Sequence, residues 1–327
     1  MEAGMEAYLR AQLLDRRQRL QSAVPLTPDT APLVRLLTEV DSALESMDRG
    51  TYGLCDVCHD PIEKDRLLRD PLLRNCLDHL TPAERRALEQ DLELAGKIQG
   101  ELLPKQDFRS GDWEIYYHYE ALGSVSGDYC DLIPANDGCL YFLLGDVSGK
   151  GVAASILMSH LHAIFRSLMS VGLPFDQLME RANRVFCDST ASSSFATLVC
   201  GKAHSAGVVE ICNAGHCPPF LIRRESSRGL EATGLPLGLF CSSPYGVQRL
   251  QFERGEGLLL YTDGLTEARN QSGEEYGSPR LEGIISRRRE TPPQMLVEAC
   301  LGDLNHFLSG ERKTDDLAIM AVRRASQ

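Results

Sequence analysis

The stretch YFLLGDVSGKG, residues 141–151, decides the fold class of the second half of this 327-residue chain. Its first four residues are apolar without interruption, a pattern that predicts a buried β-strand. Asp146 stands where that strand ends, so the sheet holds its backbone while its carboxylate points out of the core. The glycines around Asp146 let backbone carbonyls and water approach closely. The stretch therefore predicts a rigid strand that presents an acidic group at the edge of a sheet.

Three further segments repeat this combination of an apolar run and an aspartate beside glycine or a second aspartate. They read SGDYCD at 126–131, LLLYTDG at 258–264 and TDDLAI at 314–319. If their carboxylates converge, they form an oxygen-lined site suited to Mg²⁺ or Mn²⁺. Spacing alone does not show convergence, because aspartate and glycine are also the ordinary turn residues at strand ends. A shared metal site and four separate turns both remain open on these residues alone.

Strand patterns dominate the chain after residue 105. We predict strands over 113–122, 128–134, 139–146, 195–203, 207–213, 219–224, 248–252, 257–262 and 317–323, and helices over 152–171, 175–189 and 292–308. The strands come in runs, with helices in pairs between them. This order indicates an α+β fold with antiparallel sheets rather than parallel βαβ units.

Helical patterns dominate the first hundred residues. Apolar spacing predicts a hairpin of two helices over 3–22 and 31–49. The sequence TPAE at 81–84 is a strong helix start, and the helix that follows covers residues 82–103. Its apolar positions lie near heptad spacing. It is therefore either a helix packed on a domain or a signalling linker that forms a homodimer.

Eleven cysteines are present. Most lie in apolar runs, and we expect them to be reduced core residues rather than parts of a disulfide framework. Cys55, Cys58, Cys76 and His79 differ, since they read C-x2-C, seventeen residues and C-x2-H. Two such turns present four ligands to one ion, so the spacing predicts a closed, structural zinc site, with His59 as an alternative fourth ligand. A redox pair or simply buried thiols is the competing interpretation.

Residues 38–80 resemble the DksA/TraR-type zinc finger of bacteria. The resemblance rests on the cysteines together with AL at 43–44, GTYG at 50–53, PI at 61–62 and RL at 66–67. That family usually has a cysteine where His79 stands here. Some of its members regulate RNA polymerase. The resemblance therefore implies an alternative function, a non-catalytic signalling regulator that binds a partner through the hairpin and the finger.

Residues 94–323 resemble the metal-dependent protein phosphatase (PPM) superfamily, in its bacterial SpoIIE/RsbU-like branch. The matching blocks stand in family order at 94–104, 126–129, 145–151, 195–198, 213–219, 261–268 and 314–316. The resemblance implies a central β-sandwich flanked by helices, with a two-metal site at its edge. Together the two resemblances imply a hairpin at 1–50, a zinc finger at 51–81, a linker helix at 82–104 and a phosphatase domain at 105–327.

The phosphatase resemblance also implies a role for each acidic residue. Asp146 would bridge two Mn²⁺ or Mg²⁺ ions and Val147 would offer its carbonyl oxygen. Asp263 and Asp315 would complete one ion, and Asp128 would hold the other mostly through water. Lesser candidates are Asp131 and Asp316. Ala318 departs from the family, which usually has a hydroxyl residue there, and this departure is expected to weaken the support of the site.

The resemblance implies a serine/threonine phosphatase that acts on a partner-switching regulator of the anti-sigma-factor antagonist type and is regulated through its zinc module. The net charge of −12 disfavours binding to nucleic acid. No run approaches the roughly eighteen apolar residues of a membrane helix. The first seventeen residues lack the apolar stretch of a signal peptide, so we expect a cytoplasmic protein.

One motif is typical of a different class of phosphatase. The segment HCPPFLIR at 216–223 satisfies the H-C-x5-R pattern of cysteine-dependent phosphatases. That chemistry needs a loop of backbone N–H groups around the phosphate, and two prolines supply none. We therefore expect Cys217 not to be a nucleophile and His216 to make a structural hydrogen bond.

Overall fold

The computed structural model describes residues 3–23, 30–135, 137–190 and 194–326. The chain divides into two compact units, Met1–Asp91 and Leu92–Gln327. The helix α4 (Pro82–Leu102) begins in the first unit and ends in the second.

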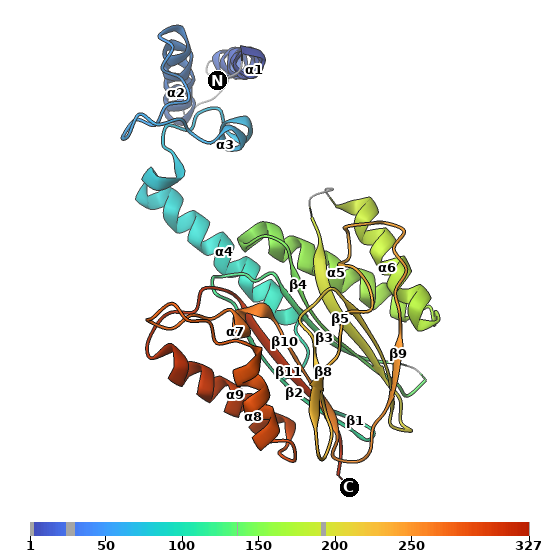
Figure 1. The fold of residues 1–327 in the computed structure, drawn as a ribbon. Helices are drawn as coiled ribbons and strands as arrows, with labels where there is room; N and C mark the ends of the chain where they lie inside the picture. Colours follow the sequence, from blue (N-terminus) through green and yellow to red (C-terminus); the bar gives the residue numbers. More distant parts are fainter. Residues whose placement is uncertain (1–2, 24–29, 136, 191–193, 327) are drawn as a thin grey trace. The chain divides into compact units, whose positions relative to one another are not determined.

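The first unit is built on two antiparallel helices, α1 (Ala3–Ala23) and α2 (Ala31–Asp48), drawn in blue in Figure 1. Leu9 and Leu13 of α1 are fully buried against Val40 and Leu44 of α2, because residues four apart share one face of a helix. Ion pairs Arg10–Asp48 and Arg17–Asp41 run alongside, and they fix the antiparallel direction. Below the hairpin lie α3 (Lys64–Arg69) and a 3₁₀ turn at Leu77–His79.

Helix α4 begins at Pro82, as the sequence TPAE predicts. The Glu84 carboxylate accepts hydrogen bonds from the backbone N–H (2.8 Å) and the hydroxyl (2.6 Å) of Thr81, and the Glu84 N–H donates to Thr81 Oγ1 at 3.3 Å. This reciprocal pair satisfies donors that a helix start leaves open. The helix ends at Leu102, just before Pro104.

The second unit is a sandwich of two antiparallel sheets (Figure 1). One sheet has six strands in the order β1-β2-β11-β10-β7-β8, and the other has five in the order β3-β4-β5-β6-β9. Their bounds are β1 (Asp107–Ser110), β2 (Trp113–Glu120), β3 (Asp128–Pro134), β4 (Leu140–Val147), β5 (Ala196–Ala203), β6 (Val208–Ala214), β7 (Phe220–Ile222), β8 (Ser227–Gly229), β9 (Gln248–Gln251), β10 (Gly257–Tyr261) and β11 (Leu317–Arg324). The antiparallel α+β prediction is confirmed.

Helices cover both outer faces of the sandwich. The pair α5 (Gly151–Met169) and α6 (Phe175–Ser189) packs on the five-stranded sheet, and α8 (Ser278–Arg287) with α9 (Pro293–Leu308) packs on the six-stranded sheet. A short helix, α7 (Asp263–Thr266), follows β10 directly. The core between the sheets contains Phe142, Leu144, Leu260 and Met320. Burial on both faces explains why most strands read as continuous apolar runs.

In the described part of the chain, α5 is long and apolar enough to cross a membrane by length and composition. Its apolar side chains Met158, Leu161 and Phe165 are nevertheless packed into the core beneath it, and its Arg166 pairs with the buried Asp131. These contacts make α5 a core helix of the sandwich.

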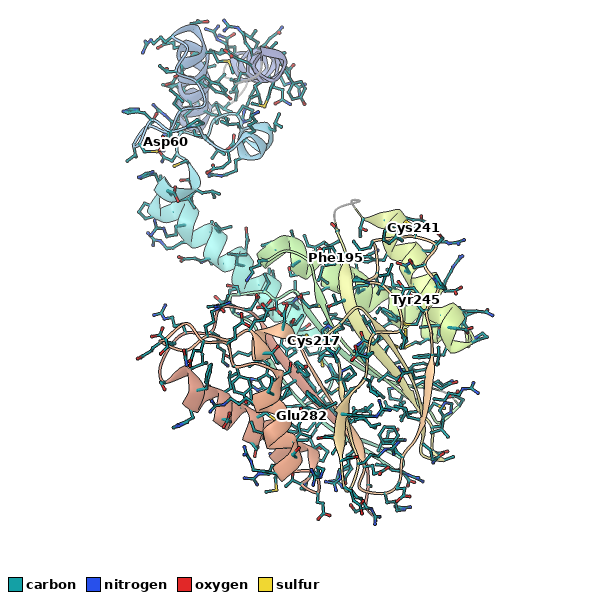
Figure 2. The ribbon with its side chains drawn as sticks, viewed as in Figure 1. Asp60, Phe195, Cys217, Cys241, Tyr245 and Glu282 are labelled. Atoms are coloured by element: carbon teal, nitrogen blue, oxygen red, sulfur yellow. A yellow bond between two sulfur atoms is a disulfide. The ribbon has the colours of Figure 1, made fainter. Side chains whose placement is uncertain are left out.

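The expectation that the cysteines outside the Cys and His cluster are reduced is wrong for one pair. Cys187, in the last turn of α6, forms a disulfide with Cys241, whose Cα lies 5.6 Å away. The fold creates this proximity, because the Asn183 side chain already binds the backbone of Gly238 and Phe240 in the loop that carries Cys241. Cys241 is labelled beside α6 in Figure 2.

Candidate active site

Strand pairing brings Asp128 and Asp146 together. Asp128 begins β3, Asp146 stands one residue before the end of β4, and the register places the two directly opposite each other. Side chains in such positions have Cβ atoms about 4.5–5.5 Å apart on one face of the sheet. The pairing of β3 with β4 therefore makes two of the predicted ligands neighbours.

The other sheet contributes the remaining acidic residues. Asp263 is the first residue of α7, directly after β10, and Asp315 and Asp316 directly precede β11. Because β10 and β11 are paired, the Thr262 N–H donates to the Ala318 carbonyl at 2.9 Å, which holds these two segments side by side. The four aspartates predicted to be the main ligands thus meet at the edge of the sandwich.

These carboxyl groups lie close enough for the charge of one to shift the pKa of another. Burial, followed by the charges of Asp263, Asp315 and Asp316, raises the pKa of Asp146 to about 7. Burial and the Asp146 charge raise the pKa of Asp128 well above its usual range. Burial and the Asp315 charge also raise the pKa of Asp263. Carboxyl groups that repel each other in this way are a favourable donor set for a hard divalent cation, which would relieve the repulsion.

A lysine ammonium already lies in this negative field. Lys150 Nζ donates to Asp315 Oδ2 at 2.7 Å, and this hydrogen bond raises the pKa of Lys150, with further contributions from the Asp316 and Asp263 charges. Lys150 stands between two glycines of left-handed backbone conformation, with φ of +100° at Gly149 and +67° at Gly151. The turn that follows Asp146 therefore also places the Lys150 ammonium beside Asp315.

Gly127 keeps the site open at its base. A Cβ at this position would lie 3.2 Å from the Val147 carbonyl oxygen and 3.5 Å from Asp146 Oδ1. A side chain here would press on the Val147 carbonyl oxygen, whereas its contact with Asp146 would be an ordinary one. The space beside the Val147 carbonyl fits its predicted role.

Asp316 and Asp131, the two lesser candidates, differ in position. Asp316 accepts a backbone N–H on each oxygen, from Leu122 and from Gly127, both at 2.8 Å, so it ties down the loop that leads to Asp128. Asp131 is fully buried and lies three residues along β3, on the opposite face of the sheet, where Arg166 binds both of its oxygens at 2.6 and 2.9 Å. The structure does not bring Asp131 together with the other acidic residues.

Thr262 contacts the candidate site, although the sequence did not single it out. Its hydroxyl donates to Asp128 Oδ2 at 2.9 Å and accepts the Ala318 N–H at 2.9 Å. Thr262 is itself fully buried. Ala318 thus takes part through its main chain, and the hydroxyl that supports the site comes from Thr262. Its position in the TDG motif was the available signal.

Gln99 is a second residue of this kind. It is buried near the end of α4, its amide nitrogen donates to the Ser126 carbonyl at 2.7 Å, and its amide oxygen accepts the Ser126 N–H at 2.9 Å. Ser126 in turn lies two residues before Asp128. The last turns of α4 and Asp316 therefore hold the same loop from two sides.

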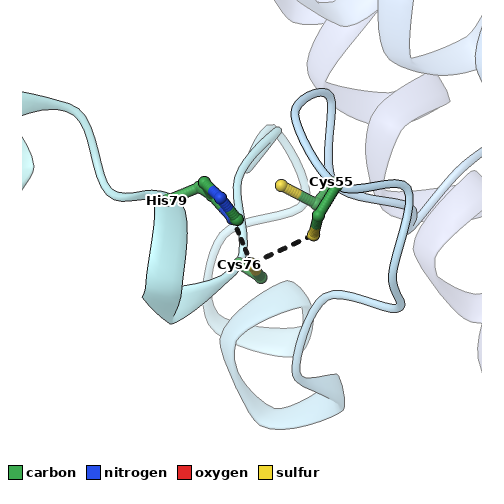
Figure 3. Close-up of side chains that lie close together, drawn as sticks. Cys55, Cys76 and His79 are labelled. Atoms are coloured by element: carbon green, nitrogen blue, oxygen red, sulfur yellow. Dashed lines mark hydrogen bonds between the residues drawn. The ribbon is translucent and has the colours of Figure 1, made fainter.

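The first unit contains the predicted Cys and His cluster. The ligand atoms of Cys55, Cys58, Cys76 and His79 all lie within 4.8 Å of one another. Figure 3 shows Cys55, Cys76 and His79 converging, with Cys76 Sγ at 3.3 Å from His79 Nδ1. All three thiols are free, and among the described residues the group includes His79 rather than His59. Although burial favours the neutral thiol, the backbone N–H groups of Cys58, Cys76 and Val57 lower the pKa of Cys55 to about 6. The neighbouring Cys58 shifts the other way. Although the backbone hydrogen bond of Asp60 lowers it, burial and the side chains of Cys55 and Cys76 raise the pKa of Cys58 to about 11. Of these two thiols, Cys55 is therefore the one that more readily becomes the thiolate a metal requires.

The sequence model of the SpoIIE family, named for stage II sporulation protein E, matches residues 136–325, more than half of the chain. The chain belongs to the SpoIIE family. The match includes Asp146, Asp263 and Asp315, while Asp128 and the Cys and His cluster lie before it.

Three curated relatives align with 72% of this chain each. Protein IcfG of Synechocystis is 28% identical over 263 residues, which are 41% of that protein. The phosphoserine phosphatases RsbU and RsbP of Bacillus subtilis are 25% and 26% identical, over 71% and 58% of their lengths. The chain thus spans only part of these relatives.

Two solved structures share the fold of the second unit. The RsbU and RsbW domains of a Mycobacterium tuberculosis protein align with a TM-score of 0.57 and 27% identity, covering 66% of this chain and 61% of that one. The SiaA PP2C domain of Pseudomonas aeruginosa aligns with a TM-score of 0.66 and 17% identity, covering 75% and 99%. The second likeness establishes the fold alone.

Proposed function

We propose that this SpoIIE-family protein is a metal-dependent phosphatase that hydrolyses phosphoserine or phosphothreonine on a partner-switching regulatory protein. The observation that carries the proposal is the position of Asp128, Asp146, Asp263 and Asp315 at neighbouring strand ends, where burial and the charges of nearby carboxylates raise the pKa of Asp128, Asp146 and Asp263. Family membership and the likeness to phosphatases named RsbU and RsbP support it. A complete acidic set of this kind argues against the non-catalytic alternative.

Asp146, Asp263, Asp315 and Asp128 would hold two Mn²⁺ or Mg²⁺ ions, and Val147 would offer its carbonyl oxygen. Bound ions of this type neutralise phosphate charge and make a water molecule nucleophilic at neutral pH. The chain supplies the orientation. Thr262 fixes the Asp128 carboxylate, and Gly127 leaves room beside Val147 and Asp146.

The test compares the full chain with Asp146→Ala and Asp263→Ala, using a phosphoserine protein as substrate and Mn²⁺ as the probe metal. We expect each substitution to lower activity by more than about 100-fold, since even residues that only support a ligand cost 10–100-fold. Asp176→Ala, an exposed carboxylate on α6, is the matched control and leaves activity unchanged. Equal activity of the wild type and Asp146→Ala would refute the proposal.

We also propose that Cys55, Cys58, Cys76 and His79 bind one structural zinc ion, as in the DksA/TraR-type finger that this segment resembles. Four protein ligands within 4.8 Å of one another leave no open coordination position. Metal analysis of the purified chain should give one zinc per chain, and Cys76→Ala should abolish it. A chain that carries no zinc and keeps its fold would contradict this assignment.

The proposed organisation is an input module, made of a hairpin at 1–50 and a finger at 51–81, a linker helix at 82–104 and a phosphatase domain at 105–327. We propose a cytoplasmic location and a homodimer formed through residues 82–103. Leu88, Leu94 and Ile98 are exposed along α4, which supports association of this helix with a second copy. Light scattering of the wild type and of Leu94→Glu tests it, with a monomeric wild type as the contradicting result.

A further inference from the structure

His216 lies directly behind the acidic site and is held there rigidly. It follows β6 in the turn NAGH, where Gly215 takes a left-handed conformation with φ of +68°. The Asn213 side chain fixes the backbone of His216 from both sides, because its oxygen accepts the His216 N–H at 2.7 Å and its nitrogen donates to the His216 carbonyl at 3.1 Å. The backbone of His216 is therefore fixed in this turn.

One edge of the His216 ring contacts the sheet that carries Asp146. Its Nδ1 lies 2.8 Å from Thr197 Oγ1. Thr197 stands opposite Asp146 in the register of β4 and β5, and its hydroxyl also reaches toward the Asp146 carbonyl at 3.4 Å. The ring is thus one residue away from the backbone of the central predicted ligand.

The other edge contacts the second sheet. His216 Nε2 is enclosed next to the backbone of Tyr261 and has no partner in full hydrogen-bonding geometry among the described residues. Tyr261 precedes Thr262, which binds Asp128, and Asp263, which is a predicted ligand. A single ring therefore spans the gap between the strand ends that carry the acidic groups.

We infer that His216 is a positioning residue that sets the separation between Asp146 and Asp263, and thereby the metal affinity of the site, without touching a metal ion itself. The inference rests on the proposed metal centre and names a residue that supports it. Burial lowers the pKa of His216 to about 4, so the ring is a neutral spacer at physiological pH. A neutral ring has one donor nitrogen and one acceptor nitrogen, so it can serve a different hydrogen-bonding role toward each sheet.

The test measures Mn²⁺ binding to the full chain by calorimetry, without substrate. We expect His216→Leu and Thr197→Val each to weaken binding by about 10–100-fold, the usual cost of losing a group that orients a ligand. His216→Gln keeps a donor and an acceptor, so we expect it to recover most of the affinity. Tyr245→Phe is the matched control, since Tyr245 is equally buried in the same unit and its hydroxyl also lacks a partner among the described residues (Figure 2).

The outcomes distinguish a failure of the positioning role of His216 from a failure of the metal centre itself. Mn²⁺ binding that His216→Leu and Thr197→Val leave at the wild-type value would overturn the positioning role alone, while Asp146→Ala still loses binding. A wild type that binds no Mn²⁺ would overturn the metal centre and this inference together. Thermal melts without Mn²⁺ accompany each variant, and Thr197→Val, which keeps the volume of the side chain, decides the matter if His216→Leu does not fold.

Discussion

Burial and neighbouring negative charges together raise the pKa of the Asp146 carboxyl group. Its folded-state pKa of about 7 lies above the ordinary value of 3.8, so the folded chain binds a proton that the unfolded chain has released between about pH 4 and pH 7. A raised carboxyl pKa makes the folded state progressively less stable as pH rises through this window. The metal-free site therefore opposes folding most strongly at alkaline pH.

We predict that the chain, in buffer without divalent cations, melts at a lower temperature at pH 8 than at pH 5.5. Asp146→Asn removes the central charge and should raise the melting temperature at pH 8 by about 2–4 °C for each kcal/mol of repulsion relieved. Adding Mn²⁺ should stabilise the wild type at pH 8 but not this variant. A variant that melts below the wild type at pH 8 would show that the repulsion is not the dominant effect.

Lys150 acts on the same groups as an incoming metal ion. We predict that Lys150→Met strengthens Mn²⁺ binding, because the cation no longer competes with an ammonium at Asp315. Lys150 is 67% exposed, so the gain should stay within about fivefold, the range of an exposed ion pair. Titration calorimetry measures it, with Lys150→Arg as the charge-preserving control. Weaker binding by Lys150→Met would instead assign the lysine a supporting role.

Among the single residues of the site, the four main aspartates could be predicted from the sequence because each lies in a local motif at a strand end. Thr262 was not singled out, because its partner Asp128 is 134 residues away in the chain and only the packing of two sheets joins them. Asp131 shows the opposite problem. It belongs to the same short motif as Asp128, but side chains along a strand alternate between faces, and an odd spacing of three turns Asp131 toward α5.

Among the elements, α4 offers two glycines with opposite surroundings. A Cβ on Gly96 would lie 2.2 Å from the Ser124 carbonyl oxygen, whereas a Cβ on Gly100 would meet nothing within 4 Å. The close approach at Gly96 allows α4 to hold the loop of Ser124 and Ser126. This loop leads to Asp128.

We predict that Gly100→Ala stabilises the protein by about 0.5–1 kcal/mol through helix propensity, without an effect on Mn²⁺ binding. Gly96→Ala has the same propensity gain but must push the Ser124 backbone away. We therefore expect lower stability and weaker Mn²⁺ binding from Gly96→Ala. Denaturant unfolding and calorimetry on this pair separate the loop contact from the helix itself, and identical behaviour of the two variants would exclude the contact.

The link between α6 and the loop of Cys241 gives another prediction. The disulfide joins residues 54 apart, so its removal by Cys241→Ser should cost about 2–4 kcal/mol under non-reducing conditions. Under reducing conditions the wild type and the variant should unfold alike. Cys139→Ser, which removes a free cysteine, is the control. A wild type whose stability does not respond to reductant would show that the two thiols stay unjoined in solution.

Most elements of the second unit could be predicted because burial and periodicity mark them strongly, as for β3 and α6, whose bounds are those expected. The elements that were not predicted are short. β1 and β8 have four and three residues, too few for a recognisable pattern, and α8 has only ten residues with a single apolar face. The Cys187–Cys241 link was also out of reach, because it depends on a loop conformation that no local signal encodes.

For the molecule as a whole, the two proposed metal sites lie in different units. The first unit has a small core around Leu9, Leu13 and Val40, so most of its stability should depend on zinc, as in other small metal-bound domains. We predict that Cys76→Ala raises hydrogen exchange across residues 51–79 and leaves β3 and β4 unchanged. Mass-spectrometric exchange on the full chain measures both regions at once. Uniform protection in the variant would show that the first unit folds without its metal.

The strand order of the six-stranded sheet has a consequence for synthesis. β11, which ends the fold, lies between β2 and β10 rather than at an edge, and Asp315 stands just before it. A nascent chain that has not yet delivered residues 315–324 has a split sheet with two open edges and an incomplete set of the proposed acidic ligands. We therefore expect the proposed metal site to form only after β11 has taken its place between β2 and β10.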